Sequence, residues 1–171
     1  LEVDQREVQS NLFYIKYKIE DEDNFITIAT TRPETMLGDT AVAVNPKDSR
    51  YKNYIGKKII VPIVERKLKI IADKYVSIEQ GSGALKVTPA HDPNDWDIGV
   101  RHQLEVINTM APNGSISTAH GWDDANDEAQ QFVGLSREDA RVAVIKWFKA
   151  NDLFEEIKSY THSVGHSYRS H

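Results

Sequence analysis

Hydrophobic and polar positions alternate along much of the first two thirds of the chain, a pattern that predicts a series of short strands. The expected strands cover residues 12–19, 25–31, 40–44, 58–64, 67–72, 75–79, 84–89 and 105–110. The polar residues 21–24 predict a turn between the first two strands, and Pro112-Asn113-Gly114 predicts a turn after the last.

Two segments change from alternation to helical spacing. In the first, Asp92 is expected to cap the helix, with Pro93 at the first helical position and Asp95 three residues after the cap. In the second, Ser136 begins a capping-box-like pattern, followed by apolar residues four apart: Ala140, Val144 and Phe148. Many short strands with few helices predict an α+β fold, a β-barrel-like core with surrounding α-helices.

Composition narrows the function classes. The 171 residues fit one domain, residues 1–171, and carry a net charge of −5, which disfavours a module that grips nucleic acid by charge alone. The absence of cysteine excludes disulfides, thiolate metal sites and a cysteine nucleophile. No apolar run approaches the roughly 20 residues of a membrane helix, so no membrane partner is expected. The first residue is Leu and neither end carries a terminal signal, which indicates a piece of a longer chain.

A first cluster of chemically capable residues lies where the second expected strand ends. Three threonines, an arginine and a glutamate stand within residues 30–35, and Pro33 fixes a sharp exit from the strand. These side chains and the backbone amides after the turn suit a small polar pocket. A strand that simply runs into a capped turn explains the same residues.

A second cluster follows the strand expected at residues 84–89. In a strand, Lys86 and Thr88 point to the same face, and that face leads to His91, Asp92 and Asp95. Two carboxylates at the mouth of a pocket suit one that binds a substrate ammonium and one that accepts a hydrogen bond from a hydroxyl. Aspartates are also ordinary at helix starts, and the two interpretations are compatible.

Other motifs carry less weight. The Gly81–Lys86 segment resembles a phosphate-binding loop loosely, but it leads into a strand instead of a helix. His162, His166 and His171 have no carboxylate or cysteine partners nearby in the sequence, so no metal site is predicted. No nucleophile elbow or Ser–His–Asp arrangement stands out, which disfavours a covalent intermediate.

Taken together, residues 30–42 and 86–95 resemble the editing domain of class I aminoacyl-tRNA synthetases, most closely the valyl type. Arg101-His102, Ile107-Asn108 and residues 162–166 fit the same resemblance, which covers nearly the whole chain. In that family the domain is a β-barrel with surrounding helices, inserted in a Rossmann-type catalytic domain. The resemblance implies that residues 1–13 and 160–171 are the neck strands leading to that catalytic core.

The resemblance also implies an activity. The domain would hydrolyse threonine wrongly attached to tRNA(Val), or threonyl-adenylate, in the cytoplasm. Its partners would be the 3′ aminoacyl end of tRNA(Val) and the remaining domains of the parent synthetase. Editing would need no cofactor, since ATP serves only the synthetic site of the parent enzyme. Two alternatives stay open: an isoleucyl-type editing domain, and an aminoacyl-adenosine binding module that is inactive without the rest of the enzyme.

Residue roles follow from the same resemblance. Asp92 would accept the threonine hydroxyl and Asp95 would hold the α-ammonium of the substrate. The substrate-binding wall would comprise Thr30, Thr31, Arg32 and Thr35. The candidates that orient water or stabilise the oxyanion are Lys86, Thr88, His91 and Asp95.

Overall fold

The fold is built around a strongly bent sheet. The computed structural model describes the backbone of residues 3–167 and the side chains of residues 10–161. Its strands are β1 (Val3–Ile19), β2 (Phe25–Thr30), β3 (Ala41–Val44), β4 (Lys58–Ile60), β5 (Lys67–Ala72), β6 (Ala84–Val87) and β7 (Phe154–Ser167).

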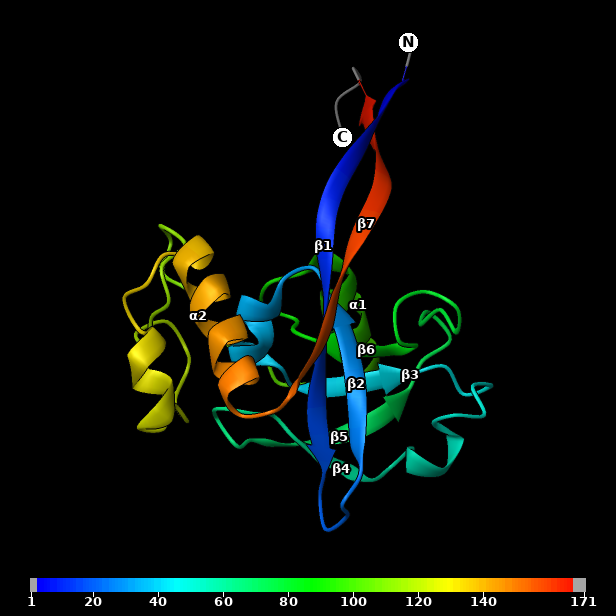
Figure 1. The fold of residues 1–171 in the computed structure, drawn as a ribbon, viewed down its shortest axis with the longest axis horizontal. Helices are drawn as coiled ribbons and strands as arrows, with labels where there is room; N and C mark the ends of the chain where they lie inside the picture. Colours follow the sequence, from blue (N-terminus) through cyan, green and yellow to red (C-terminus); the bar gives the residue numbers. More distant parts are fainter. Residues whose placement is uncertain (1–2, 168–171) are drawn as a thin grey trace.

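Strand pairing nearly closes this sheet into a barrel. The hydrogen-bonded order is β2-β1-β4-β5-β3-β6, and β7 pairs with β1 outside this path. The β3–β5 pair is parallel, and the other pairs are antiparallel. β2 and β6, at the two ends of the order, lie side by side (Figure 1). The expected α+β class with a barrel-like core is confirmed.

β1 and β7 together form a long antiparallel ribbon that projects from the barrel (Figure 1). The register runs from the Val3–Ser167 pair to the Ile15–Phe154 pair, with an irregularity after Tyr14. The described parts of both expected neck segments therefore pair with each other. Residues 1, 2 and 168–171 lie outside the described residues, and the connection to a catalytic core stays a prediction.

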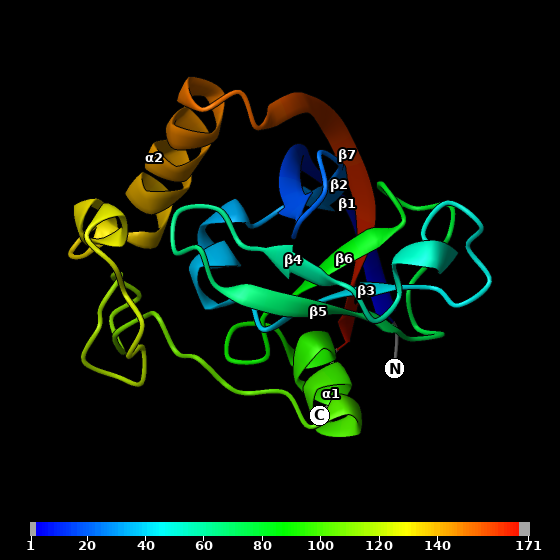
Figure 2. The same ribbon diagram turned by 90° about the horizontal axis from the view of Figure 1, so that it is seen from below.

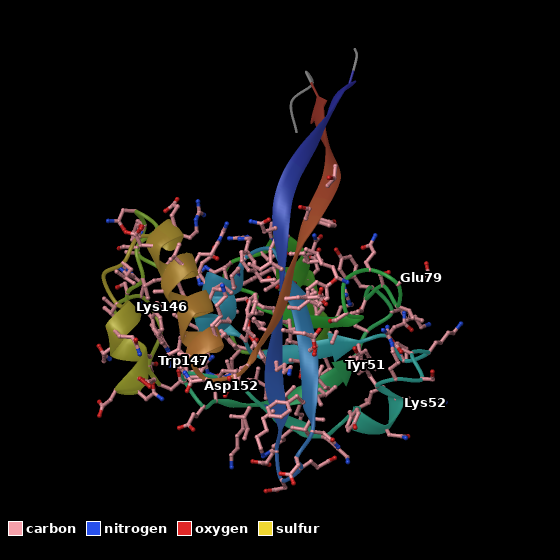
Figure 3. The ribbon with its side chains drawn as sticks, in the orientation of Figure 1. Tyr51, Lys52, Glu79, Lys146, Trp147 and Asp152 are labelled. Carbon is pink, nitrogen blue, oxygen red and sulfur yellow. The ribbon has the colours of Figure 1, made fainter. Side chains whose placement is uncertain are left out.

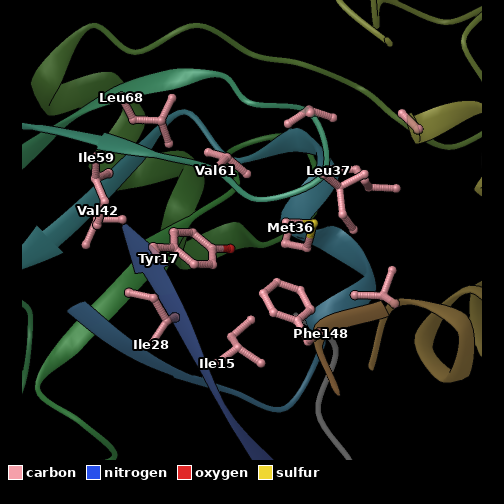
Figure 4. Packing of buried hydrophobic residues seen from close by; sticks show 14 of the residues in the cluster. Ile15, Tyr17, Ile28, Met36, Leu37, Val42, Ile59, Val61, Leu68 and Phe148 are labelled. Atoms are coloured by element: carbon pink, nitrogen blue, oxygen red, sulfur yellow. The ribbon is translucent and has the colours of Figure 1, made fainter. Parts of the chain in front are cut away.

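Alternation along β1 explains the core. Ile15, Tyr17 and Ile19 are fully buried, whereas Lys16 and Lys18 between them face outward. Ile28 of β2, Val42 of β3 and Ile59 of β4 pack around the Tyr17 ring (Figure 4). Fully burying an aliphatic side chain of this size contributes about 1.5–3 kcal/mol, so this cluster supplies the main stabilisation of the barrel.

Both predicted helices are present with the expected caps. Asp92 Oδ1 accepts from the N–H groups of Asn94 and Asp95 at the start of α1 (Pro93–His102). Ser136 Oγ accepts from Asp139 N at the start of α2 (Arg137–Ala150), which buries Ala140, Val144 and Phe148. Figure 2 shows α2 beside the barrel and α1 against a different face of the sheet. None of the helices in residues 3–167 has the length and apolar character that a bilayer span requires.

The small residues of β3 explain how α1 sits. Val42 and Val44 point into the main core, whereas Ala41 and Ala43 pack with Val87 and with Ile98 of α1 in a second cluster. Alanine at both outward positions lets the helix lie close to the sheet. This packing sets the start of α1 beside the end of β6.

Short 3-10 helices complete the fold: η1 (Pro33–Gly38), η2 (Lys52–Tyr54) and η3 (Glu128–Phe132). Three sequence predictions need correction. The strand expected at 58–64 ends at Ile60, because a turn around Pro62 follows, with Ile63 at a positive φ of 69°. Residues 75–79 form a loop, because the carboxylate of Asp73 and the hydroxyl of Ser77 accept the backbone N–H groups that a strand would pair. Residues 105–110 contain only an isolated bridge from Met110 to Ile116.

Candidate functional site

A cavity of about 490 Å³ opens where the ribbon joins the barrel. Its walls come from the end of β2 and the turn after it, from β6 and the loop before it, and from the first turn of α1. Leu12 of β1 and Tyr160 of β7 complete the lining at the base of the ribbon. Seven of the nine sequence-predicted site residues line it: Thr30, Thr31, Arg32, Thr35, Lys86, Asp92 and Asp95.

The threonine-rich wall is held by its own hydroxyls. Thr30 Oγ1 accepts from Arg32 N at 3.0 Å, and Thr35 Oγ1 donates to Arg32 O at 3.0 Å. Arg32 Nη1 donates to the carbonyl oxygen of His91 at 2.9 Å, which ties this turn to the start of α1. The two sequence clusters therefore meet in space, 59 residues apart in the chain.

Glu34, from the same cluster, points away from the cavity. Its fully buried carboxylate pairs with Arg141 of α2. Figure 3 shows α2, with Lys146 and Trp147, on one side of the barrel and the loop that carries Glu79 on the other. Glu34 thus connects the turn that forms the threonine-rich wall to α2, on the side away from the cavity.

Two carboxylates line the cavity at the start of α1. Asp92 uses Oδ1 for the helix cap, and the described residues make no hydrogen bond to its Oδ2. Asp95 is 7% exposed, and its Oδ2 accepts from Thr88 N at 2.9 Å. Its Oδ1 likewise accepts no hydrogen bond from the described residues. Each carboxylate therefore keeps one oxygen for a ligand.

Burial raises the pKa of Asp95 to about 6, and the neighbouring carboxylates of Asp92 and Asp39 add to this effect. The hydrogen bond from Thr88 N and the charge of Lys86 act in the opposite direction. A buried carboxylate with little counter-charge is well suited to bind a cationic group, because the incoming cation relieves the cost of burying the anion.

Lys86 lies in the cavity wall, and its ammonium makes three hydrogen bonds to protein acceptors. Nζ donates to Thr35 Oγ1 at 2.6 Å, to Thr88 Oγ1 at 2.5 Å and to Asp39 Oδ1 at 2.9 Å. The expected shared face of Lys86 and Thr88 is confirmed by this contact. Thr88 itself is 1% exposed and lies behind the cavity wall.

His91 is not among the residues that line the cavity, contrary to the sequence expectation. Its Nε2 accepts from Thr109 N at 3.2 Å and lies 3.2 Å from Thr109 Oγ1. Burial and the positive charges of Lys86 and Arg32 lower the pKa of His91 to about 4, so the imidazole is neutral at pH 7. The imidazole points toward Thr109 because this residue, which is distant in sequence, provides the hydrogen bond.

Sequence reasoning missed several wall residues. The loop Gln80–Gly83 lines the cavity, although its sequence predicts neither a phosphate-binding loop nor another site. The signal was its glycines, since Gly81 and Gly83 adopt positive φ of 59° and 80°. A Cβ at Gly83 would collide with Arg50 Nη2, whose ion pair with Asp48 supports this loop. Leu12 and Tyr160 gave no local signal, because only the β1–β7 pairing brings them together.

Within the described residues, no group of three or more His, Cys, Asp or Glu side chains could hold a metal ion. The side chains of His162 and His166, and all of His171, lie outside the described residues. The cavity instead combines an acidic end, a hydroxyl-rich wall with one guanidinium, and an aromatic and aliphatic side at the ribbon. This combination suits a ligand that carries a cationic group, a hydroxyl and a flat or apolar portion.

Comparisons with known proteins identify similar chains. Residues 52–149 match the family model described as "Leucyl-tRNA synthetase, editing domain". The valine–tRNA ligases of Staphylococcus haemolyticus and Staphylococcus aureus strain JH9 are each 53% identical over 170 residues, which is 99% of this chain. The chain spans 18% of the length of these relatives.

Two solved structures share the fold. The LeuRS in the ternary complex of Agrobacterium radiobacter K84 agnB2 LeuRS, tRNA and LeuAMS aligns with a TM-score of 0.64 at 18% identity, covering 91% of this chain and 20% of that one. The GlLeuRS-CP1 structure aligns with a TM-score of 0.62 at 12% identity, covering 85% of this chain and 96% of that one.

Proposed function

Because the chain belongs to the leucyl-tRNA synthetase editing-domain family, we propose that it is the editing domain of a valine–tRNA ligase that hydrolyses threonine wrongly esterified to tRNA(Val). The 53% identity to valine–tRNA ligases favours the valyl type over the isoleucyl alternative. The partners would be the 3′ aminoacyl end of tRNA(Val) and the other domains of the parent enzyme, in the cytoplasm.

The observation that carries this proposal is the pair of α1 carboxylates, each with one oxygen left for a ligand. Asp95 would receive the α-ammonium and Asp92 the side-chain hydroxyl of threonine. Valine carries a methyl group where threonine carries the hydroxyl, so the Asp92 acceptor would stay desolvated and unpaired. Such a loss costs about 1–3 kcal/mol, which corresponds to roughly 5–150-fold discrimination, and the cost is larger for a charged acceptor such as this carboxylate.

The reaction would be direct attack of water on the ester carbonyl. The water oxygen bonds to the carbonyl carbon, the ester C–O bond breaks, and threonine and the free ribose hydroxyl of the tRNA are released. Among the candidates for catalysis, Asp95 lies in the cavity wall with one oxygen that no described residue uses, which suits direct contact with substrate or water. Lys86 also lines the cavity, but its ammonium donates to three protein acceptors, which suits the support of the wall. Thr88 and His91 suit the support of that wall, through Asp95 and Arg32 respectively.

The proposal is tested by mixing the chain with threonyl-tRNA(Val), valyl-tRNA(Val) and valyl-tRNA(Ile). We expect hydrolysis of the first at least tenfold faster than of the second. Equal rates on the first two esters would contradict the threonine selectivity, and preferential hydrolysis of the third would favour the isoleucyl-type alternative. Binding of a threonyl-adenosine analogue without turnover would favour the inactive binding module. A chelator arm is expected to leave the rate unchanged, and inhibition by the chelator would instead indicate a metal-dependent hydrolase.

A further inference from the structure

Asp39 carries a carboxylate that no sequence pattern singles out and that is not among the residues lining the cavity. It follows η1 and is 0% exposed. Its Oδ2 accepts from the phenol of Tyr17 at 2.6 Å, and its Oδ1 accepts from Thr88 Oγ1 at 2.6 Å and Lys86 Nζ at 2.9 Å. Burial, followed by the Asp39 carboxylate, raises the pKa of Tyr17 well above its ordinary value, which keeps the phenol a donor.

The position of Asp39 is fixed by more than its side chain. Arg66 Nη1 donates to the carbonyl oxygens of Leu37 and Asp39, at 3.0 and 2.9 Å. Backbone and carboxylate are therefore both held, and the Lys86 ammonium pairs with a rigid anion. A buried ammonium needs such a partner, because desolvation of an unpaired charge costs several kcal/mol.

Thr88 is hydrogen-bonded both to the Lys86 ammonium and to the carboxylate of Asp95. Its hydroxyl accepts from Lys86 and donates to Asp39, whereas its backbone N–H donates to Asp95. Lys86 is thus close to a second carboxylate with which it makes no ion pair. If Lys86 turned to Asp95, it would occupy the oxygen that the proposed function assigns to the substrate ammonium.

We propose that Asp39 is a positioning residue for editing: it holds the Lys86 ammonium against its own carboxylate and the Thr88 hydroxyl, and so keeps Asp95 open to the α-ammonium of the substrate. This inference rests on the proposed function, because it gives Asp95 its ligand. Asp39 does not touch the substrate, and it acts through Lys86. The Tyr17 hydrogen bond orients the Asp39 carboxylate but adds no charge to it.

Two non-hydrolysable compounds test this role. One is threonine joined by an amide bond to 3′-amino-3′-deoxyadenosine, and the other is the matching 3-hydroxybutanoyl compound, which lacks the α-amino group. The measured quantity is the ratio of their dissociation constants, with thermal unfolding recorded for each protein. The variants are Asp39→Asn, the double variant Asp39→Asn/Lys86→Met, and Tyr17→Phe as a control that keeps the charge of Asp39.

We expect wild type to prefer the amino compound, Asp39→Asn to lose that preference by about tenfold or more, and the double variant to regain it. Tyr17→Phe should keep the wild-type preference. Equal weakening of both compounds in Asp39→Asn, or a loss that persists in the double variant, would overturn the inference. If Asp39→Asn does not fold, the double variant decides alone, since it buries no unpaired lysine: a wild-type preference supports the inference and a lost preference overturns it. A wild-type protein without any preference for the amino compound would contradict the proposed function itself.

Discussion

The guanidinium of Arg141 donates two hydrogen bonds to the fully buried carboxylate of Glu34, from Nε to Oε1 at 2.8 Å and from Nη2 to Oε2 at 2.9 Å. The two residues lie 107 positions apart, on α2 and η1. The pair joins the outer helix to the turn whose other side forms the threonine-rich wall. Cavity shape and the packing of α2 are therefore coupled.

Removing Arg141 should destabilise the protein. Arg141→Met leaves the Glu34 carboxylate buried and unpaired, and we expect a loss of about 2–3 kcal/mol in the free energy of unfolding, below the range for fully buried pairs because the arginine is 39% exposed. Urea unfolding measures the change. Arg137→Met on the same helix, at an exposed position, should stay within about 0.5 kcal/mol of wild type. A similar change in both variants would argue against a specific role for the pair.

Asp92→Asn should separate capping from substrate selection. The amide oxygen can still accept from the N–H groups of Asn94 and Asp95, whereas the second carboxylate oxygen, which no described residue uses, is replaced by an NH2 donor. We expect near-wild-type stability but a roughly tenfold or greater loss of discrimination between threonyl and valyl esters. Asp92→Ala, by contrast, should also lose about 1 kcal/mol of stability with the cap. Full discrimination in Asp92→Asn would reject its role in reading the hydroxyl.

Binding of the amino compound should depend on pH through Asp95. Burial raises its pKa to about 6, so the carboxylate form that attracts an ammonium dominates only above that pH. Affinity for the amide-linked threonyl-adenosine analogue should therefore rise between pH 5 and 7 and then level off, as isothermal titration would show. Lys86→Met should move the midpoint to higher pH, because the ammonium favours the ionised carboxylate. A midpoint that stays near 4 would contradict the assignment to Asp95.

The raised pKa of Asp95 also makes the stability of the fold depend on pH. The direction of this dependence is opposite to that of a carboxylate in an ordinary ion pair. Because the folded-state pKa of Asp95 is above its unfolded value, the folded protein binds this proton more tightly. The associated stability is complete below about pH 4 and is lost as pH rises through 6. Asp95→Asn should consequently raise the free energy of unfolding by about 2–3 kcal/mol at pH 7.5, and this gain should shrink towards zero at pH 4. Asp97→Asn, an exposed neighbour on α1, is the control that should show no such dependence.

Local chemistry made part of this site predictable. The cap by Asp92, the first turn through Asp95 and the shared face of Lys86 and Thr88 all depend on residues within a few positions of each other. The threonine-rich turn is marked by Pro33 in the same way. These features follow from backbone geometry and capping, which act over one helical turn or two strand residues.

The rest depended on partners far along the chain. His91 was expected in the cavity, but Thr109 offers its ring a hydrogen bond elsewhere. Asp39 has no role that the sequence predicts, because nothing near it in the chain indicates Tyr17 as its donor. Residues 75–79 read as a strand by alternation, yet Asp73 satisfies the backbone of a loop instead. In each case a tertiary contact outweighed a local pattern.

The positions of the lining residues in the chain also determine at which stage of folding the cavity can form. Leu12 belongs to the first strand and Tyr160 to the last, and both line the same space. Contacts of such high sequence separation form slowly, since loop-closure entropy is lost before the contact contributes. During synthesis from the N-terminus, the acidic end and the threonine wall are translated well before β7. The binding space is therefore completed only after β7 has been synthesised and has paired with β1.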